Sequence, residues 1–207
     1  MPSSEFSPLF RFQHAKTTGE YDAVLRLRHL AYAHAGKVSR EGPVEAMGDA
    51  FDAESTIFLA YDAGKLVATM RAFLTRNGQP FDHGRYAKFP DDFPPLDRCV
   101  EASRLAVDLD FQGKGLLAAM VTELAAFALS QRRRYLFGGA AGALIEIYRR
   151  YGAQVVGEPY CNPALSNLEH RIIVMDLEKL VHARQGITQD IWMRLYCDLA
   201  KRFAPLA

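Results

Sequence analysis

The stretch LDFQGKGLLAAMVTELAAFALSQRR, residues 109–133, joins a glycine-rich turn to a long apolar helix pattern. Backbone N–H groups at a helix start have no internal partner, and the helix dipole adds partial positive charge there. Glycines let this backbone approach an anion closely, because no Cβ stands in the way. The turn therefore predicts a pyrophosphate cradle formed by Gln112, Gly113, Lys114 and Gly115. A plain tight turn before a core helix is an equally good interpretation of this segment alone.

The composition narrows the class of protein. The 207 residues carry a formal net charge of +1, so bulk charge gives no reason to expect nucleic acid as a partner. Three scattered cysteines without metal-ligand spacing argue against a disulfide scaffold or a metal site. The N-terminus MPSSEFSPLF lacks the basic and apolar regions of a signal peptide, and no apolar run reaches the length of a membrane span. We expect a cytoplasmic location.

Hydrophobic periodicity predicts a mixed α/β (α+β) sheet with helices on both faces. The helix pattern repeats at 20–35, 115–132, 143–152 and 188–203, and strand patterns occupy 10–15, 55–62, 65–74, 99–108, 135–140, 153–160 and 169–177. We expect one domain over 1–207 with a C-terminal helical extension at about 186–207. Residues 75–98 hold four prolines and many aromatics, so we expect this loop to have a function, such as a lid at 80–96.

The glycine-rich turn resembles the acyl-CoA pyrophosphate loop of the GNAT N-acyltransferases, Gln/Arg-x-x-Gly-x-Gly/Ala. Gln112 and Gly115 match this pattern, and Leu117 stands where a small residue is expected. The element order is also the GNAT order, and ALIEIYRRYGA (143–153) resembles the family's late helix. There Tyr148 occupies the position of the residue that protonates the departing thiolate, although an amphipathic packing role is the alternative.

Four further segments resemble a narrower branch, the acyl-homoserine lactone synthases and long-chain N-acyl amino acid synthases. They are LRHLAY (27–32), GDAFD (48–52), ATMRAF (68–73) and VEASRLAV (100–107). The resemblance implies a substrate cleft held by Arg28, Tyr32, Asp49, Asp52, Arg71, Ser103 and Arg104, together with Glu101. The charged residues of this set are equally well explained as structural salt bridges. Lactone synthases usually carry a tryptophan soon after the first helix, and its lack here favours an N-acyl amino acid synthase.

The residues of the fourth strand suggest a chemistry of their own. Strand alternation places Glu101, Ser103 and Leu105 on one face and points Arg104 to the other. Apolar neighbours desolvate Glu101, which suits a general base that deprotonates an amine, directly or through a water. Cys99 has no activating histidine nearby in sequence, so we do not expect it to be a nucleophile.

The resemblance also implies a path for the donor. In GNAT folds the strands corresponding to 99–108 and 135–140 part, and the pantetheine arm lies between them. Backbone N–H groups of Ala106, Val107 and Asp108 would polarise the thioester carbonyl. Tyr148 would protonate the sulfur, and no metal or covalent enzyme intermediate is required. An acyl slot could be lined by Leu116, Leu117, Met120, Phe127, Phe137 and Phe89, for most of which a core role is the better interpretation.

The sequence therefore predicts an N-acyltransferase that moves an acyl group from a pantetheine thioester to the amine of an amino acid or similar small molecule. The co-substrate is acyl-CoA or acyl-acyl-carrier-protein, and no permanently bound cofactor is expected. The basic cluster at 131–135 is either a solvated helix end or a dock for an acidic carrier protein. An acetyl-CoA-dependent GNAT acetyltransferase and a non-catalytic ligand-binding module are the alternatives, and the chain is expected to be a monomer or homodimer.

Overall fold

The computed structural model describes residues 10–75 and 80–206. The N-terminal stretch and residues 76–79 of the predicted loop lie outside these ranges. The described residues form a seven-stranded sheet of order β1-β2-β3-β4-β5-β7-β6. Only β4 and β5 pair in parallel, and the other neighbours are antiparallel. The strands are β1 (Arg11–His14), β2 (Thr56–Asp62), β3 (Lys65–Phe73), β4 (Cys99–Val107), β5 (Tyr135–Ala140), β6 (Gln154–Cys161) and β7 (Glu169–Asp176).

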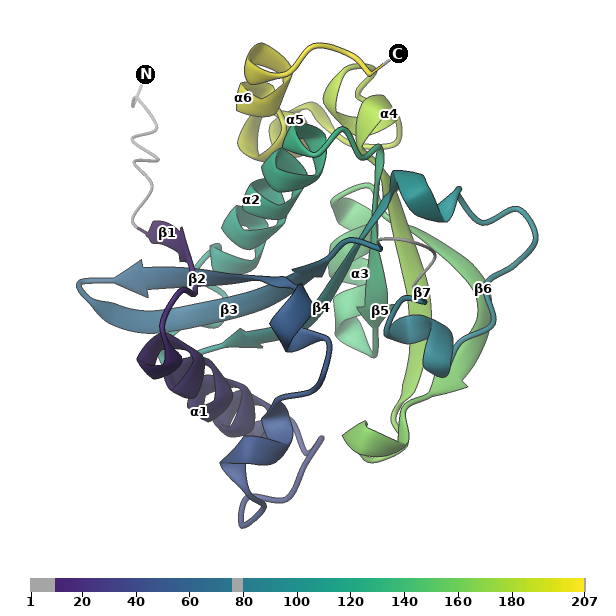
Figure 1. The fold of residues 1–207 in the computed structure, drawn as a ribbon. Coiled ribbons are helices and arrows are strands. Elements are labelled where there is room, and N and C mark those ends of the chain that lie inside the picture. Colours follow the sequence, from purple (N-terminus) through teal and green to yellow (C-terminus); the bar gives the residue numbers. More distant parts are fainter. Residues whose placement is uncertain (1–9, 76–79, 207) are drawn as a thin grey trace.

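Helices cover both faces of the sheet, as predicted. Helix α1 (Thr18–His34) packs on one face over β3 and β4, and its start is fixed by a capping box between Thr17 and Glu20. Helices α2 (Leu116–Ser130) and α3 (Ala143–Arg150) cover the opposite face (Figure 1). No helix in the described part of the chain combines the length and the hydrophobicity of a membrane span.

The C-terminal helix differs from the single helix predicted at 188–203. Three short helices follow β7, namely α4 (Leu177–Val181), α5 (Gln189–Leu195) and α6 (Cys197–Arg202). The break falls at Tyr196, which is fully buried and donates its hydroxyl proton to Tyr151 O at 2.6 Å. Thr122 Oγ1 of α2 donates to Leu195 O at 3.2 Å. Tertiary contacts thus override helix propensity and fix α5 and α6 against α2.

The described part of the predicted loop, residues 80–98, packs against the sheet through its aromatic side chains. Phe81 is buried between Phe73 of β3 and Phe137 of β5, with ring centroids 5.9 and 4.8 Å away. Phe89 and Phe93 also meet Phe137 edge-on. This aromatic cluster covers the part of the α1 face that α1 itself does not cover, and the segment predicted as a lid, 80–96, contributes to it.

A bulge in β4 changes the direction of its side chains. Arg104 has a φ of +56°, and the β3–β4 register shifts at this point. Glu101 and Ser103 lie on the α1 face, whereas Leu105 lies with the α2-face core. The predicted alternation was therefore wrong beyond Ser103, because the extra residue reverses the side-chain period.

The strands β4 and β5 part after a short pairing. They pair only from Cys99 with Tyr135 to Ala102 with Gly138. A Cβ on Gly138 would lie 2.3 Å from Ala102 O, so only glycine permits this close approach. Beyond this point β4 continues to Val107 with β3 as its only neighbour. An opening between two strands, such as the resemblance implies, is thus present.

Candidate active site

A cavity of about 110 Å³, open to solvent, lies where β4 and β5 part. Its walls include residues 102–105 of β4 and Gly138 and Gly139 of β5, and we call it the gap cavity. Polar residues line it on the α1 face, including Asp82, His83 and Tyr160. On the α2 face it is apolar, lined by Met70, Val121, Leu124, Leu136, Ile173 and Met175. The cavity therefore passes from a polar side to an apolar side of one sheet.

The predicted base, Glu101, is fully buried and does not line the gap cavity. Its Oε2 accepts from the backbone N–H of Asp82 at 2.8 Å, and its Oε1 from that of His83 at 3.3 Å. His83 Nδ1 also hydrogen-bonds Glu101 Oε1. The carboxylate therefore holds the imidazole, and the imidazole stands between the carboxylate and the cavity.

The other nitrogen of His83 faces Tyr160. A Cβ on Gly139 would lie 2.6 Å from His83 Nε2 and 2.2 Å from Tyr160 Oη, so glycine makes room for both groups. Burial raises the pKa of the Tyr160 phenol, and the negative charges of Glu101 and Asp82 add to this rise. His83 was not predicted from the sequence, because its only signal was its place in the long loop.

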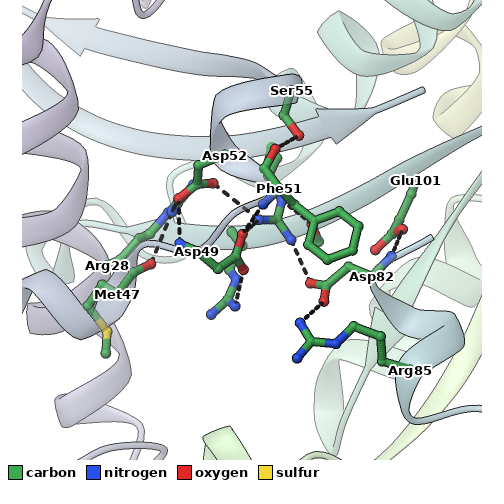
Figure 2. A network of polar contacts seen from close by, with 12 residues as sticks. Arg28, Met47, Asp49, Phe51, Asp52, Ser55, Asp82, Arg85 and Glu101 are labelled. Atoms are coloured by element: carbon green, nitrogen blue, oxygen red, sulfur yellow. Dashed lines mark hydrogen bonds and ion pairs between the residues drawn. The ribbon is translucent and has the colours of Figure 1, made fainter. Parts of the chain in front are cut away.

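The predicted charges do form a network, which lies on the α1 face (Figure 2). Arg28 of α1 is fully buried and donates to both oxygens of Asp52, at 2.7 and 3.1 Å. Arg71 of β3 binds Asp49 at 2.5 Å and Asp52 at 3.2 Å. Arg104 completes the set at Asp49 Oδ2, also at 2.5 Å. Three guanidinium groups thus meet the carboxylates that the motifs supply.

Arg71 connects this network to the catalytic candidates. Its Nη2 binds Asp82 Oδ2 at 2.6 Å, and its Nε donates to Ser103 Oγ at 2.9 Å. Because the backbone N–H of Asp82 is bound to Glu101, the network fixes the segment that carries His83. Burial works to raise the pKa of Asp49, but the guanidinium groups of Arg71 and Arg104 outweigh it and hold that pKa below its ordinary value.

The predicted substrate-binding residues fall into two groups. Tyr32, Ser103 and Arg104 line the gap cavity. The second group does not line the cavity and is connected to it only through the hydrogen bonds of the network. Its members are Arg28, Asp49, Asp52 and Arg71. The motif therefore supplies a few cavity residues and a buried frame that orients them.

Tyr148 of α3 lines the gap cavity and belongs to the α2-face core, opposite His83. Burial raises the pKa of its phenol, with smaller contributions from Tyr151 and Tyr32. A phenol with a raised pKa stays protonated at neutral pH and can donate its proton. The cavity thus has a proton acceptor on one wall and a proton donor on the other.

A second cavity of about 530 Å³ runs from the gap to the start of α2, and we call it the cradle cavity. Gln112, Gly113 and Gly115 line it, together with Ala106 and Val107. Gly115 has a φ of +80°, and no side chain caps α2. The first N–H groups of this helix therefore point to the cavity without an internal partner. Both cavities share Tyr32, Lys37, Leu105 and Leu144.

Two of the predicted donor-binding residues are not part of this cavity. Lys114 lies outside its lining and holds its ammonium 5.0 Å from the ring centroid of Phe111. The N–H of Asp108 donates to Val67 O at 2.8 Å, so it cannot polarise a thioester. Because N–H directions alternate along a strand, that of Val107 points away from β3 and into the gap. The predicted trio of N–H donors therefore reduces to Val107 at this end of β4.

Arg194 of α5 also lines the cradle cavity, although it was not predicted from the sequence. A Cβ on Gly115 would lie 2.8 Å from its Nη2. The C-terminal segment thus brings a guanidinium group to the cradle, which suits an anionic ligand. No local pattern links Arg194 to a turn about eighty residues earlier.

The apolar lining only partly matches the predicted slot. Leu116 and Leu117 line the cradle cavity, and Phe137 lines the gap cavity. Phe89, Met120 and Phe127 line neither. Cys99 is fully buried, and burial raises the pKa of its thiol to about 12, so it does not serve as a nucleophile.

Comparisons with known proteins agree with this geometry. The model of the N-acyl amino acid synthase FeeM family matches residues 23–176. FeeM itself, an N-acyl amino acid synthase from uncultured soil microbes, superposes with a TM-score of 0.60 at 16% identity, covering 94% of this chain and 98% of that one. TofI, in a ternary complex with an inhibitor and MTA, gives 0.64 at 17% identity, covering 88% and 98%.

A GNAT family acetyltransferase from Elizabethkingia anophelis with acetyl-CoA bound gives a TM-score of 0.53 at 15% identity, covering 82% of this chain and 99% of that one. At these identities the structural likenesses show the fold, which is the GNAT-like α/β fold that the sequence predicted. A search of curated proteins found no match.

Proposed function

The chain belongs to the N-acyl amino acid synthase FeeM family and is an N-acyltransferase, and we propose that it transfers an acyl group from a pantetheine thioester to the amine of an amino acid. One observation carries the proposal. The opening between β4 and β5 has the Glu101–His83 pair on one side and Tyr148 on the other. A thioester in this opening meets both groups that acyl transfer needs.

The donor enters by the cradle cavity. Its phosphate binds the uncapped start of α2, where Arg194 adds positive charge. The pantetheine arm then follows Ala106 and Val107 to the gap. Leu117 lines this path at the position where GNAT enzymes have a small residue, which favours a donor carried by an acyl carrier protein over acyl-CoA.

The acceptor binds from the polar side. Its neutral amine attacks the thioester carbonyl, and His83 Nε2 takes the proton that the nitrogen loses. Glu101 does not reach the amine, but it binds Nδ1 and stabilises the imidazolium that forms. Glu101 is therefore a positioning residue in this mechanism. The N–H of Val107 stabilises the oxyanion of the tetrahedral intermediate.

The intermediate collapses as the C–N bond becomes an amide and the C–S bond breaks. The leaving thiolate takes the proton of the Tyr148 hydroxyl. The proton gained by His83 passes to solvent, from which the phenolate is protonated again, so the proton balance closes. Orientation and fixed charges supply the rate gain.

The apolar side of the gap cavity supports this proposal over an acetyl-CoA-dependent enzyme. Beyond the sheet, Val121 and Leu124 of α2 and Met175 of β7 continue the cavity as an apolar space. An acetyl group ends at the carbonyl and needs no such space. The continuation therefore favours an acyl chain longer than acetyl.

The test combines donors and acceptors in one matrix. Purified protein is incubated with acetyl, octanoyl and dodecanoyl donors, each on CoA and on acyl carrier protein, against the common amino acids. Amide products are scored by mass spectrometry. We expect N-acyl amino acids from the long-chain donors, formed faster from the carrier protein. Transfer of acetyl alone would favour the acetyltransferase, and no amide from any donor would favour a non-catalytic module.

A further inference from the structure

Lys37 is a cation in the gap cavity that the mechanism above does not use. It follows α1 and lines both cavities where they join. Its backbone is fixed on two sides, because its N–H donates to Tyr32 O at 2.8 Å and its carbonyl accepts from Ser166 Oγ at 2.9 Å. Its ammonium lies 5.3 Å from the ring centroid of Tyr32. The side chain is therefore held at the cavity by its backbone and by an aromatic face.

The charge of Lys37 has no counter-ion among the residues that the structure describes. No carboxylate of the described residues lies within 4.0 Å of its ammonium, in contrast to Arg104, which binds Asp49. The one acidic residue in the cavity lining, Asp82, is bound by Arg71. Burial lowers the pKa of Lys37, and no opposite charge offsets this effect. A partly desolvated and unpaired ammonium is costly unless a ligand supplies the negative charge.

We propose that Lys37 binds the carboxylate of the acceptor amino acid and so makes the enzyme specific for amino acids over simple amines. This inference rests on the proposed function and adds the group that recognises the acceptor. His83 is in the same cavity, so one acceptor can have its carboxylate at Lys37 and its amine near His83 Nε2. The phosphate of the donor is the other possible anion, but Gln112, Gly113 and Gly115 of its cradle line only the second cavity, whereas His83 lines only the first.

The test compares Lys37→Met with the wild-type enzyme on matched acceptors. Each amino acid that the wild type acylates is paired with its own amide, which keeps the amine and the side chain but lacks the carboxylate. Loss of a charge-assisted contact raises the acceptor KM about 10–100-fold, while the KM for the amide and for the donor stays unchanged. Lys37→Arg retains the charge and is expected to restore most of the discrimination.

Controls separate the possible failures. Lys201→Met removes an exposed cation that pairs with Asp198, and its kinetics should equal wild type. Thermal unfolding of each variant shows whether the fold is kept, and Lys37→Arg tests the proposal even if Lys37→Met unfolds. The proposal is overturned if the amino acid and its amide are affected alike, or if only the donor KM rises, which would assign Lys37 to the phosphate. Absence of any wild-type turnover would instead refute the proposed function.

Discussion

The two sides of the sheet at the β4–β5 gap differ in polarity. On the α1 side, three arginines and three aspartates form a buried network that ends at Glu101 and His83. On the α2 side, the same cavity is lined by aliphatic and thioether side chains and by Tyr148. An amine and its proton need the first environment, and an acyl chain needs the second. The difference places the reacting carbonyl in the opening between them.

The network is not explained by stability alone. Buried ion pairs lose most of their Coulombic gain to desolvation, and apolar residues of similar volume often stabilise a fold equally well. The network also has a positioning role, because the ion pair between Arg71 and Asp82 holds the segment that carries His83. The polar side thus fixes the position of His83, whereas the apolar side provides space for an acyl chain.

The largest effect is expected from removal of the proton acceptor on the polar side. His83→Ala should lower kcat about 10²–10⁴-fold, because this variant loses the imidazole that takes the proton of the amine. The donor KM should stay unchanged. Glu101→Gln should lower kcat less, because the imidazole remains but loses its charged partner. Rates are measured with the best donor and acceptor. His34→Ala, at the exposed end of α1, is the control, and a full kcat in His83→Ala would contradict the assignment.

The next effect concerns the frame of the polar side. Arg71→Met leaves Asp49, Asp52 and Asp82 without their shared cation, so the free energy of unfolding should fall by about 3–5 kcal/mol. Arg85→Met is a matched control, because Arg85 lies 3.5 Å from Asp82 but its side chain is half exposed. Its loss should be under about 1 kcal/mol. Equal urea midpoints for the two variants would show that the network is not the frame we describe.

How far the sequence predicted this site depends on the kind of signal. The glycine turn and the start of α2 were predicted because positive-φ glycines and a helix periodicity are local, and Gly113 and Gly115 do have positive φ. The family resemblance is confirmed by the FeeM family match. It located Glu101, but not the histidine that Glu101 holds, since their contact joins residues eighteen apart through a loop without periodicity.

Two other features lacked a sequence signal for different reasons. The bulge at Arg104 cannot be predicted from the alternation of side chains along a strand. The residue that breaks the alternation is an ordinary arginine in an otherwise regular strand. The break at Tyr196 depends on the buried position of its ring and on its bond to Tyr151, both of which are tertiary.

The basic cluster at 131–135 follows the C-terminus of α2, the end opposite the cradle, and Arg134 pairs with Asp176.

A smaller effect is expected at the proton donor on the apolar side. Tyr148→Phe should lower kcat about 10²-fold, near the lower limit for general acids, because a thiolate leaves without full protonation. The acceptor and donor KM values should stay the same. Tyr61→Phe in β2, at a residue that lines neither cavity, serves as the control. An unchanged kcat in Tyr148→Phe would remove this residue from the mechanism.

The smallest effect concerns chain length. Val121→Trp fills the apolar side of the gap cavity, so the ratio of kcat/KM for dodecanoyl to octanoyl donors should fall about tenfold or more. Turnover of the acetyl donor provides the internal control, since a short group does not reach α2. If the ratio is unchanged in a folded variant, the chain lies elsewhere.

A structure of the enzyme with a non-transferable thioether analogue of a dodecanoyl-pantetheine donor tests the central claim most directly. We expect the arm to pass between β4 and β5 beyond Ala102, with the sulfur near Tyr148 and the chain against Val121 and Leu124. A chain lying on the α1 side, against Asp82 and His83, would contradict the assignment of the two sides. An arm bound outside the opening would contradict the account as a whole.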